Sequence, residues 1–114
     1  MIKLKDERQV TTVSNLRGGI GDLTREDLFT PDEALGKLNL CAVLTIPDGN
    51  SIGEHPHGPD AELYYILSGT LRVTDDGVTK DLHPGDSVFT GGGTSHSVLN
   101  VSGKDASLLA VIIK

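Results

Sequence analysis

The chain has 114 residues, which is enough for one domain with a single core and leaves no room for a separate cofactor domain. Its formal net charge is −6 and its lysines and arginines do not cluster, which argues against a nucleic acid or an anionic membrane as partner. The N-terminal segment is charged from Lys3 onward and contains no long apolar run, so we expect neither a signal peptide nor a membrane span. The single cysteine, Cys41, excludes an internal disulfide and fits a reducing compartment, so we expect a cytoplasmic protein.

The amino-acid composition favours an all-β fold. Hydrophobic residues make up 37% of the chain and aromatic residues 4%, with 14 glycines and 5 prolines. These proportions are typical of a compact aliphatic core between many tight turns. A core of this size gains burial when two copies of a chain pair, so we expect a homodimer.

The N-terminal third predicts only minor elements. Charged and apolar residues alternate up to about Thr12, as in a peripheral strand or an arm. The glycine-rich stretch 17–22 predicts a turn with positive φ angles. A phosphate-binding loop is not favoured there, because the stretch lacks the lysine and the strand-to-helix context. Two short helices are predicted, with starts at residues 24–27 and 30–33.

The first strong strand is predicted over residues 37–46. Alternate positions form one apolar face, which consists of Leu38, Leu40, Ala42, Leu44 and Ile46. Cys41 falls on the opposite face, and no neighbour in the sequence favours its thiolate. We therefore interpret Cys41 as a small apolar residue and not as a reactive thiol.

The rest of the chain reads as short strands separated by turn signals. The predicted strands span residues 63–67, 70–74, 78–82, 87–90, 95–101 and 106–113. Asp75-Asp76-Gly77 is a strong hairpin signal. The last strand is apolar on both faces towards its end and must be covered on both sides, which again favours a dimer. About ten short strands, with no helix longer than two turns, predict a sandwich or barrel.

The stretch 49–69 carries the candidate chemistry. His55 and His57 are separated by one residue, so on a strand both side chains point to one face and can bind one cation. Turn-forming residues at positions 58–60 fold the chain back and can bring Glu62 beside the two imidazoles. A fourth ligand has to come from another part of the chain.

Two sequence motifs give the chain its family resemblance. In the first, a glycine, a His-x-His pair, a glutamate and a second glycine follow at fixed spacing, and the matching residues are Gly49, His55, His57, Glu62 and Gly69. In the second, the matching residues are Gly85, Gly93, His96 and Asn100. With these motifs the chain resembles the cupin superfamily of small jelly-roll barrels. Gly91 stands where that family usually has proline, a departure that loosens a turn without removing a ligand.

The resemblance covers about residues 37–114 and implies a fold and a metal site. The implied fold is an all-β cupin jelly-roll barrel, or double-stranded β-helix, in a single domain over residues 1–114 with a short N-terminal arm of about residues 1–36. The implied ligands of one divalent metal ion inside the barrel are His55, His57, Glu62 and His96. The alternative is that these are polar residues on exposed strands, or that the motifs persist without metal.

Three imidazoles and one carboxylate suit Mn, Fe, Co, Ni, Cu or Zn, and the order of affinities does not select among them. The segments around the ligands look like those of oxalate-binding, manganese-containing single-domain cupins, which favours Mn.

Outside the ligand set, Tyr64 shares the parity of Glu62 and is a candidate for substrate binding; a core or interface tyrosine is the alternative. We expect His83 and Glu54 to be surface residues and Asn100 to have a structural role.

A divalent cation with one carboxylate and three neutral imidazoles keeps a positive charge, so the site should favour a small anion. Our first hypothesis is a metal-dependent enzyme that acts on a small carboxylate or other oxygen-rich anion, by an oxalate-decarboxylase-like reaction or by dioxygenation. The alternative is a non-catalytic cupin that binds or senses a small ligand through its metal. A decarboxylase needs a proton donor beyond the ligands, which the sequence does not identify. A sugar isomerase or epimerase is less favoured, because few Lys, Arg or His residues lie near the motifs.

Overall fold

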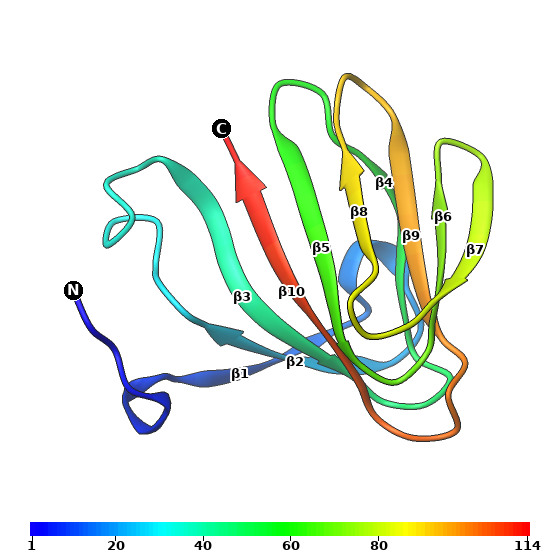
Figure 1. The fold of residues 1–114 in the computed structure, drawn as a ribbon, viewed down its shortest axis with the longest axis horizontal. Helices are drawn as coiled ribbons and strands as arrows, with labels where there is room; N and C mark the ends of the chain where they lie inside the picture. Colours follow the sequence, from blue (N-terminus) through cyan, green and yellow to red (C-terminus); the bar gives the residue numbers. More distant parts are fainter.

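Ten β-strands fold into two antiparallel sheets in the computed structural model, which describes residues 1–114 (Figure 1). The larger sheet has the strand order β1-β2-β3-β10-β5-β8 and the smaller sheet the order β4-β9-β6-β7. Strand bounds in the larger sheet are β1 Val10–Ser14, β2 Asp22–Asp27, β3 Leu38–Ile46, β10 Ala106–Ile113, β5 Ala61–Ser68 and β8 Ser87–Thr90. Those in the smaller sheet are β4 Ser51–Pro56, β9 Ser95–Asn100, β6 Leu71–Asp75 and β7 Val78–Leu82. The predicted all-β jelly-roll fold is confirmed.

The only helical segments are two 3₁₀ turns, η1 (Lys5–Glu7) and η2 (Leu16–Gly18). Neither has the length and apolar character that crossing a membrane requires.

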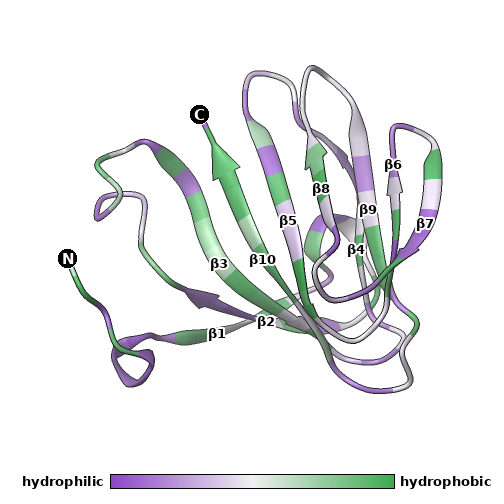
Figure 2. Cartoon of the chain, in the orientation of Figure 1, coloured by the Kyte–Doolittle hydropathy of each residue, from purple (hydrophilic) through white to green (hydrophobic).

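The core lies on the inner faces of the strands, because successive side chains of a strand point to opposite faces. The fully buried positions of β3 and β10 are Ala42, Leu44, Ile46, Ala106, Leu108 and Ala110. Leu38 and Leu40 share their face but are only half-buried, since they lie at the start of β3. The predicted apolar face of this strand is therefore confirmed. Strand β10 is hydrophobic along most of its length, and it is paired on both sides, with β3 and β5 (Figure 2).

The predicted hairpin between β6 and β7 is confirmed. Asp76 and Gly77 both have positive φ angles, 49° and 79°, which match the right-handed twist of a two-residue hairpin turn. An ion pair between Arg72 and Asp81, with 2.8 Å from Nε to Oδ1, joins the two strands across the ladder.

The helix predicted to begin at residues 24–27 is wrong, because these residues belong to strand β2. Thr24 pairs with Thr12 of β1 on one side and with Thr45 of β3 on the other. Leu23 of the same strand is 1% exposed and belongs to the core. Two ladders of backbone hydrogen bonds and one buried leucine outweigh the weak local helix signal.

The second predicted helix forms its cap but does not continue. Glu33 N–H donates to Thr30 Oγ1 at 3.2 Å, and Thr30 N–H donates to Glu33 Oε1 at 2.9 Å, which is a reciprocal capping box. The segment then ends after one turn, because Leu35 and Gly36 have left-handed φ angles of 57° and 67°. Residues 31–36 are therefore a turn that leads into β3.

The predicted glycine-rich turn becomes η2, which packs flush against β4. A Cβ atom on Gly19 would lie 2.2 Å from the Ser51 carbonyl oxygen, and one on Gly53 would lie 2.1 Å from the Arg17 carbonyl oxygen. The two backbones approach so closely only because both positions lack a side chain. Glycine at these two positions therefore holds the N-terminal segment against the strand that carries His55.

We predict that Gly53→Ala lowers the free energy of unfolding by about 1 to 3 kcal/mol, because the added methyl group forces η2 away from β4. Gly58→Ala is the matched control, since a Cβ atom at Gly58 meets nothing within 4 Å and its φ angle is not positive. Denaturant unfolding of both variants measures the effect. Equal stability of the two variants would show that the close approach is not required.

Candidate metal centre

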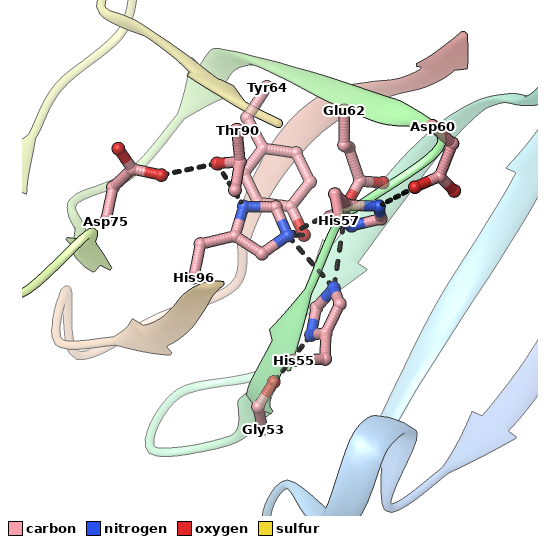
Figure 3. A network of polar contacts seen from close by, with 9 residues as sticks. All are labelled: Gly53, His55, His57, Asp60, Glu62, Tyr64, Asp75, Thr90 and His96. Carbon is pink, nitrogen blue, oxygen red and sulfur yellow. Dashed lines mark hydrogen bonds and ion pairs between the residues drawn. The ribbon is translucent and has the colours of Figure 1, made fainter. Parts of the chain in front are cut away.

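Four ligand-type side chains converge inside the barrel (Figure 3). His55 lies on β4, His57 directly follows that strand, Glu62 lies on β5 and His96 on β9. Each is no more than 7% exposed. One ligand atom of each lies within 4.8 Å of the corresponding atoms of the other three. The residues predicted as ligands are thus brought together, and they could hold a metal ion.

A β-bulge turns the first histidine inward. Ile52 pairs with Val98 and His55 pairs with His96, so three steps along β4 match two steps along β9. Without the extra residue, Ile52 and His55 would point to opposite faces; with it, both are buried. The bulge contains Gly53, a residue that is frequent at such kinks. It therefore sets the inward direction of His55, and His57 follows two residues later.

Each imidazole has its Nδ1 held by an acceptor, which decides where its proton lies. His55 Nδ1 donates to the Gly53 carbonyl oxygen at 2.8 Å, and His57 Nδ1 donates to the Asp60 carboxylate at 3.0 Å. His96 Nδ1 lies 2.9 Å from Thr90 Oγ1. Because carbonyl and carboxylate oxygens only accept, the first two imidazoles carry their proton on Nδ1.

The third imidazole is held through a relay. The Thr90 hydroxyl donates to the Asp75 carboxylate at 2.5 Å, so its oxygen accepts the Nδ1 proton of His96. All three rings therefore direct an unprotonated Nε2 toward the centre of the cluster. Outer hydrogen bonds of this kind orient histidine ligands in metal sites. Neither Thr90 nor Asp75 was predicted from the sequence, since Asp75 reaches His96 through the pairing of β6 with β9 and Thr90 reaches it from β8, which pairs with β5.

Unshared electron pairs meet at the centre of the cluster. Nε2 of His55 and Nε2 of His96 are 2.9 Å apart, and Nε2 of His57 and of His96 each lie 3.0 Å from Glu62 Oε1. Nε2 of His55 is 3.7 Å from the same oxygen. Acceptors at such distances repel each other unless a positive charge lies among them. Three imidazole nitrogens and one carboxylate oxygen are a donor set that fits a divalent transition metal.

The carboxylate of Glu62 is ionised in this setting. Burial alone raises the pKa of Glu62, but the three imidazoles around the carboxylate outweigh burial and lower the pKa from 4.5 to about 2. A carboxylate that is negative at neutral pH is ready to bind a cation without first releasing a proton.

Tyr64 lies against the cluster on the face that its parity predicted. Its ring stacks on that of His96 with centroids 4.6 Å apart and an interplanar angle of 1°, and its hydroxyl is 3.3 Å from His96 Nε2. Burial, and then the negative charge of Glu62, raise the pKa of the Tyr64 phenol well above 10, so the phenol keeps its proton. The side chain belongs to the core and also lines the cavity beside the cluster. Its part in substrate binding stays a prediction.

A cavity of about 230 Å³ opens beside His55, His57 and Glu62. Half of the lining residues are aliphatic, among them Leu16, Leu23, Leu40, Leu44, Ile52 and Ile112. Arg17 and Arg25 also line it. Sequence reasoning missed both arginines, because they lie far from the motifs along the chain and reach the cavity only through the packing of η2 and β2. The expectation of few basic groups near the motifs therefore does not hold in space.

The polar residues that we expected to lie outside the site do so. The His83 side chain is 66% exposed in a turn, and Glu54 is exposed on β4. Asn100 is buried and donates to the carbonyl oxygens of Ile46 and Lys104, both at 2.7 Å, which is a structural role. Burial raises the pKa of the half-buried Cys41 thiol, which agrees with an unreactive residue.

Glycine in place of the family proline does not disturb the ligand that follows. The Gly91 carbonyl oxygen accepts from Thr94 Oγ1 at 2.9 Å and from Thr94 N–H at 3.3 Å, which closes the turn before β9. His96 still reaches the cluster.

Comparison with known proteins gives a consistent result. The cupin domain family model Cupin_2 matches residues 42–112. An oxalate-binding protein of Thermotoga maritima is 36% identical over 113 residues, which are 99% of this chain and 93% of the relative. An uncharacterized protein of Methanocaldococcus jannaschii is 28% identical over 89 residues, or 78% of this chain and 70% of the relative.

Solved structures show the same similarity. The crystal structure of a predicted oxalate decarboxylase from Thermotoga maritima has a TM-score of 0.94 and 36% identity, and the match covers 99% of this chain and 98% of that one. The polyketide cyclase RemF from Streptomyces resistomycificus has a TM-score of 0.80 with 18% identity, over 99% of this chain and 80% of that one, and shares the fold alone.

We predict that Thr90→Val weakens metal binding roughly 10- to 100-fold, because it removes the acceptor that holds the His96 proton on Nδ1. The valine keeps the shape of threonine, so the fold should persist. Thr79→Val, on the exposed strand β7, is the control. Competition of each variant with a metal-binding dye measures its affinity for the metal. Equal affinity of the two variants would show that Thr90 is not needed to orient His96.

Proposed function

The chain belongs to the Cupin_2 family, and from this premise we propose that it binds one divalent metal ion through His55, His57, Glu62 and His96 and holds a small carboxylate anion on that ion. The observation that carries the proposal is the direction of the three imidazoles. Every Nδ1 proton is held by an outer acceptor, so three nitrogen lone pairs and one carboxylate point at a single place. Buried polar residues without a ligand to bind would not need such an arrangement.

Mn²⁺ is the metal that we favour, with Fe, Ni, Zn, Co and Cu as alternatives. Ions that accept six ligands keep open positions when four side chains bind, and a carboxylate can fill such positions. Zn²⁺ in structural sites prefers four ligands in a closed shell. The relative from Thermotoga maritima is named an oxalate-binding protein, and oxalate is an oxygen chelator that suits an open, oxygen-preferring ion.

The proposed ligand is a small anion because of the charge of the site. One carboxylate neutralises only half of the charge of a divalent cation, and the imidazoles are neutral, so one positive charge is left over in a buried place. The protein as a whole carries a net charge of −6, but the local charge decides what enters the cavity.

A metal-dependent enzyme is the second candidate, and Tyr64 is the observation that favours it. Glu62 is the only carboxylate that lines the cavity, so an oxalate-decarboxylase-like reaction would lack a carboxylic acid as proton donor. The phenol of Tyr64 keeps its proton and lies beside His96, where it could serve as donor. A dioxygenation needs no such donor. The metal would supply Lewis-acid or redox chemistry in either reaction.

Elemental analysis of protein purified without chelator or affinity metal tests the metal proposal. We expect near-stoichiometric metal in the wild type and in the control His83→Ala, and a sharp loss in His96→Ala and Glu62→Ala. Circular dichroism checks that the variants fold. Unchanged metal content in folded His96→Ala would remove His96 from the ligands, and absence of metal even after reconstitution would overturn the proposal.

Calorimetric titration with oxalate then tests the anion, and we expect binding to the metal-loaded protein and none to the metal-free protein. Consumption of oxalate or O₂ by the loaded protein would add the enzymatic function, and Tyr64→Phe would then show whether the phenol takes part. Binding without turnover would leave the binding function alone.

We also propose that the protein forms a homodimer through the outer face of the larger sheet. Ladder partners place Cys41, Val111, Leu63 and Phe89 in one row across β3, β10, β5 and β8. A second row contains Val43, Leu109 and Tyr65. Phe89 is 62% exposed and Tyr65 43% exposed. A continuous apolar face of this kind on a single chain is typical of a protein interface, and a second copy presents the same face.

We predict that Phe89→Lys converts a dimer to a monomer, because it places a charge in the apolar rows. Ile20→Lys is the control, because Ile20 is similarly exposed, at 63%, but lies beside β4 of the smaller sheet, where its carbonyl oxygen accepts from Ser51 N–H. Sedimentation equilibrium of the wild type and both variants gives the mass. A monomeric wild type, or a dimeric Phe89→Lys variant, would contradict this interface.

A further inference from the structure

The cavity beside His55, His57, Glu62 and His96, which we call the metal cluster, is lined by a cationic side chain that has no partner. The other three arginines of the chain form ion pairs: Arg8 with Glu26, Arg25 with Asp27 and Arg72 with Asp81. Arg17 lines the cavity and has no carboxylate within 4.0 Å and no side-chain hydrogen bond. Arg25 lines the same cavity, but two contacts of 3.0 Å to Asp27 neutralise its charge. Arg17 is therefore the one guanidinium in the cavity that is free to pair with an anion.

The backbone holds Arg17 in this place at the cost of a rare conformation. Its φ and ψ angles are 55° and 31°, in the left-handed region that residues with a side chain seldom adopt. Gly18 N–H and Gly19 N–H close the turn on the carbonyl oxygens of Asn15 and Leu16, at 3.0 Å and 2.9 Å. The Arg17 carbonyl group packs against Gly53 of β4. Strained residues that the surroundings hold in place are frequent at ligand-binding sites.

The four-residue cluster and Arg17 lie at different depths. The four side chains of the metal cluster are almost fully buried, whereas Arg17 is exposed and lines the cavity, which places it at the mouth. Eight of the fourteen residues that line the whole cavity are hydrophobic. A cavity of about 150 Å³ holds benzene, so the 230 Å³ found in this structure has room for a hydrocarbon body with polar ends.

Resting on the proposed function, we infer that the cavity is built for a dicarboxylic acid with an apolar chain of several carbons, with one carboxylate at the metal cluster and the other paired with Arg17. The aliphatic wall packs against the chain between the carboxylates. Oxalate fits this arrangement less well, because it has no hydrocarbon, and its two adjacent carboxylates cannot reach both ends of the cavity. The chain would thus differ from the oxalate-binding relative in the acid that it prefers.

Calorimetric titration of the Mn²⁺-loaded protein with a series of acids tests the inference. The series contains oxalate, succinate, glutarate and adipate, with butyrate, pentanoate and hexanoate as monocarboxylates of matching length. We expect one of the longer dicarboxylates to bind at least about tenfold more tightly than oxalate and than its matching monocarboxylate, which is the size of one charge-assisted hydrogen-bonded pair.

Variants of Arg17 and Arg25 test whether Arg17 is the residue that causes the preference for a longer dicarboxylate. Arg17→Gln should weaken the longer dicarboxylate about tenfold and leave its matching monocarboxylate unchanged. Arg17→Lys should restore part of the difference, and Arg25→Gln, whose charge is already paired, should change little. Metal content is measured in each variant and should equal that of the wild type, because neither arginine is a ligand.

The outcomes separate this inference from the function on which it rests. If the protein binds Mn²⁺ and oxalate, but oxalate binds more tightly than every longer acid or Arg17→Gln has no effect, the inference is wrong and the proposed function stands. If the wild type binds no metal, both are overturned.

Discussion

The site depends on where three protons lie. The Gly53 carbonyl, the Asp60 carboxylate and the Thr90 hydroxyl each accept the Nδ1 proton of one imidazole, and so the three Nε2 atoms face inward without protons. Without these outer acceptors, the same four side chains could satisfy one another by ordinary hydrogen bonds, and nothing would demand a cation. With them, the cluster has only acceptors at its centre, and a positive charge is the way to stabilise it.

The barrel provides this arrangement through strand pairing and one irregularity. The ladder between β4 and β9 sets His55 opposite His96, and the ladder between β6 and β9 sets Asp75 beside the same histidine. The bulge at Gly53 turns His55 inward and gives its carbonyl group to the ring. The same glycine lets η2 approach β4. One residue without a side chain therefore serves the metal cluster on one side and the N-terminal segment on the other.

Much of the fold could be predicted from the sequence, because period-two alternation and turn residues are local signals. The strands from residue 37 onward and the Asp76-Gly77 hairpin follow from such signals, and so does the grouping of His55, His57 and Glu62. His96 joined them through the family resemblance. Strand β2 could not be found in this way, since its conformation is decided by partners on both sides. The relay from Thr90 to Asp75, the bulge at Gly53 and the arrival of Arg17 at the cavity each depend on contacts between distant segments.

The sequence predicts an N-terminal arm, and in the structure this segment also extends the larger sheet and lines the cavity. Strands β1 and β2 extend the larger sheet, and Val13, Leu16, Arg17 and Leu23 all line the cavity beside the metal cluster. The four candidate ligands come from the two motifs in the barrel, whereas part of the cavity wall and the unpaired charge of Arg17 come from residues before the motifs. In a family whose shared scaffold hosts many chemistries, such a division would allow the four-residue cluster to stay constant while the N-terminal segment changes the wall of the cavity beside it.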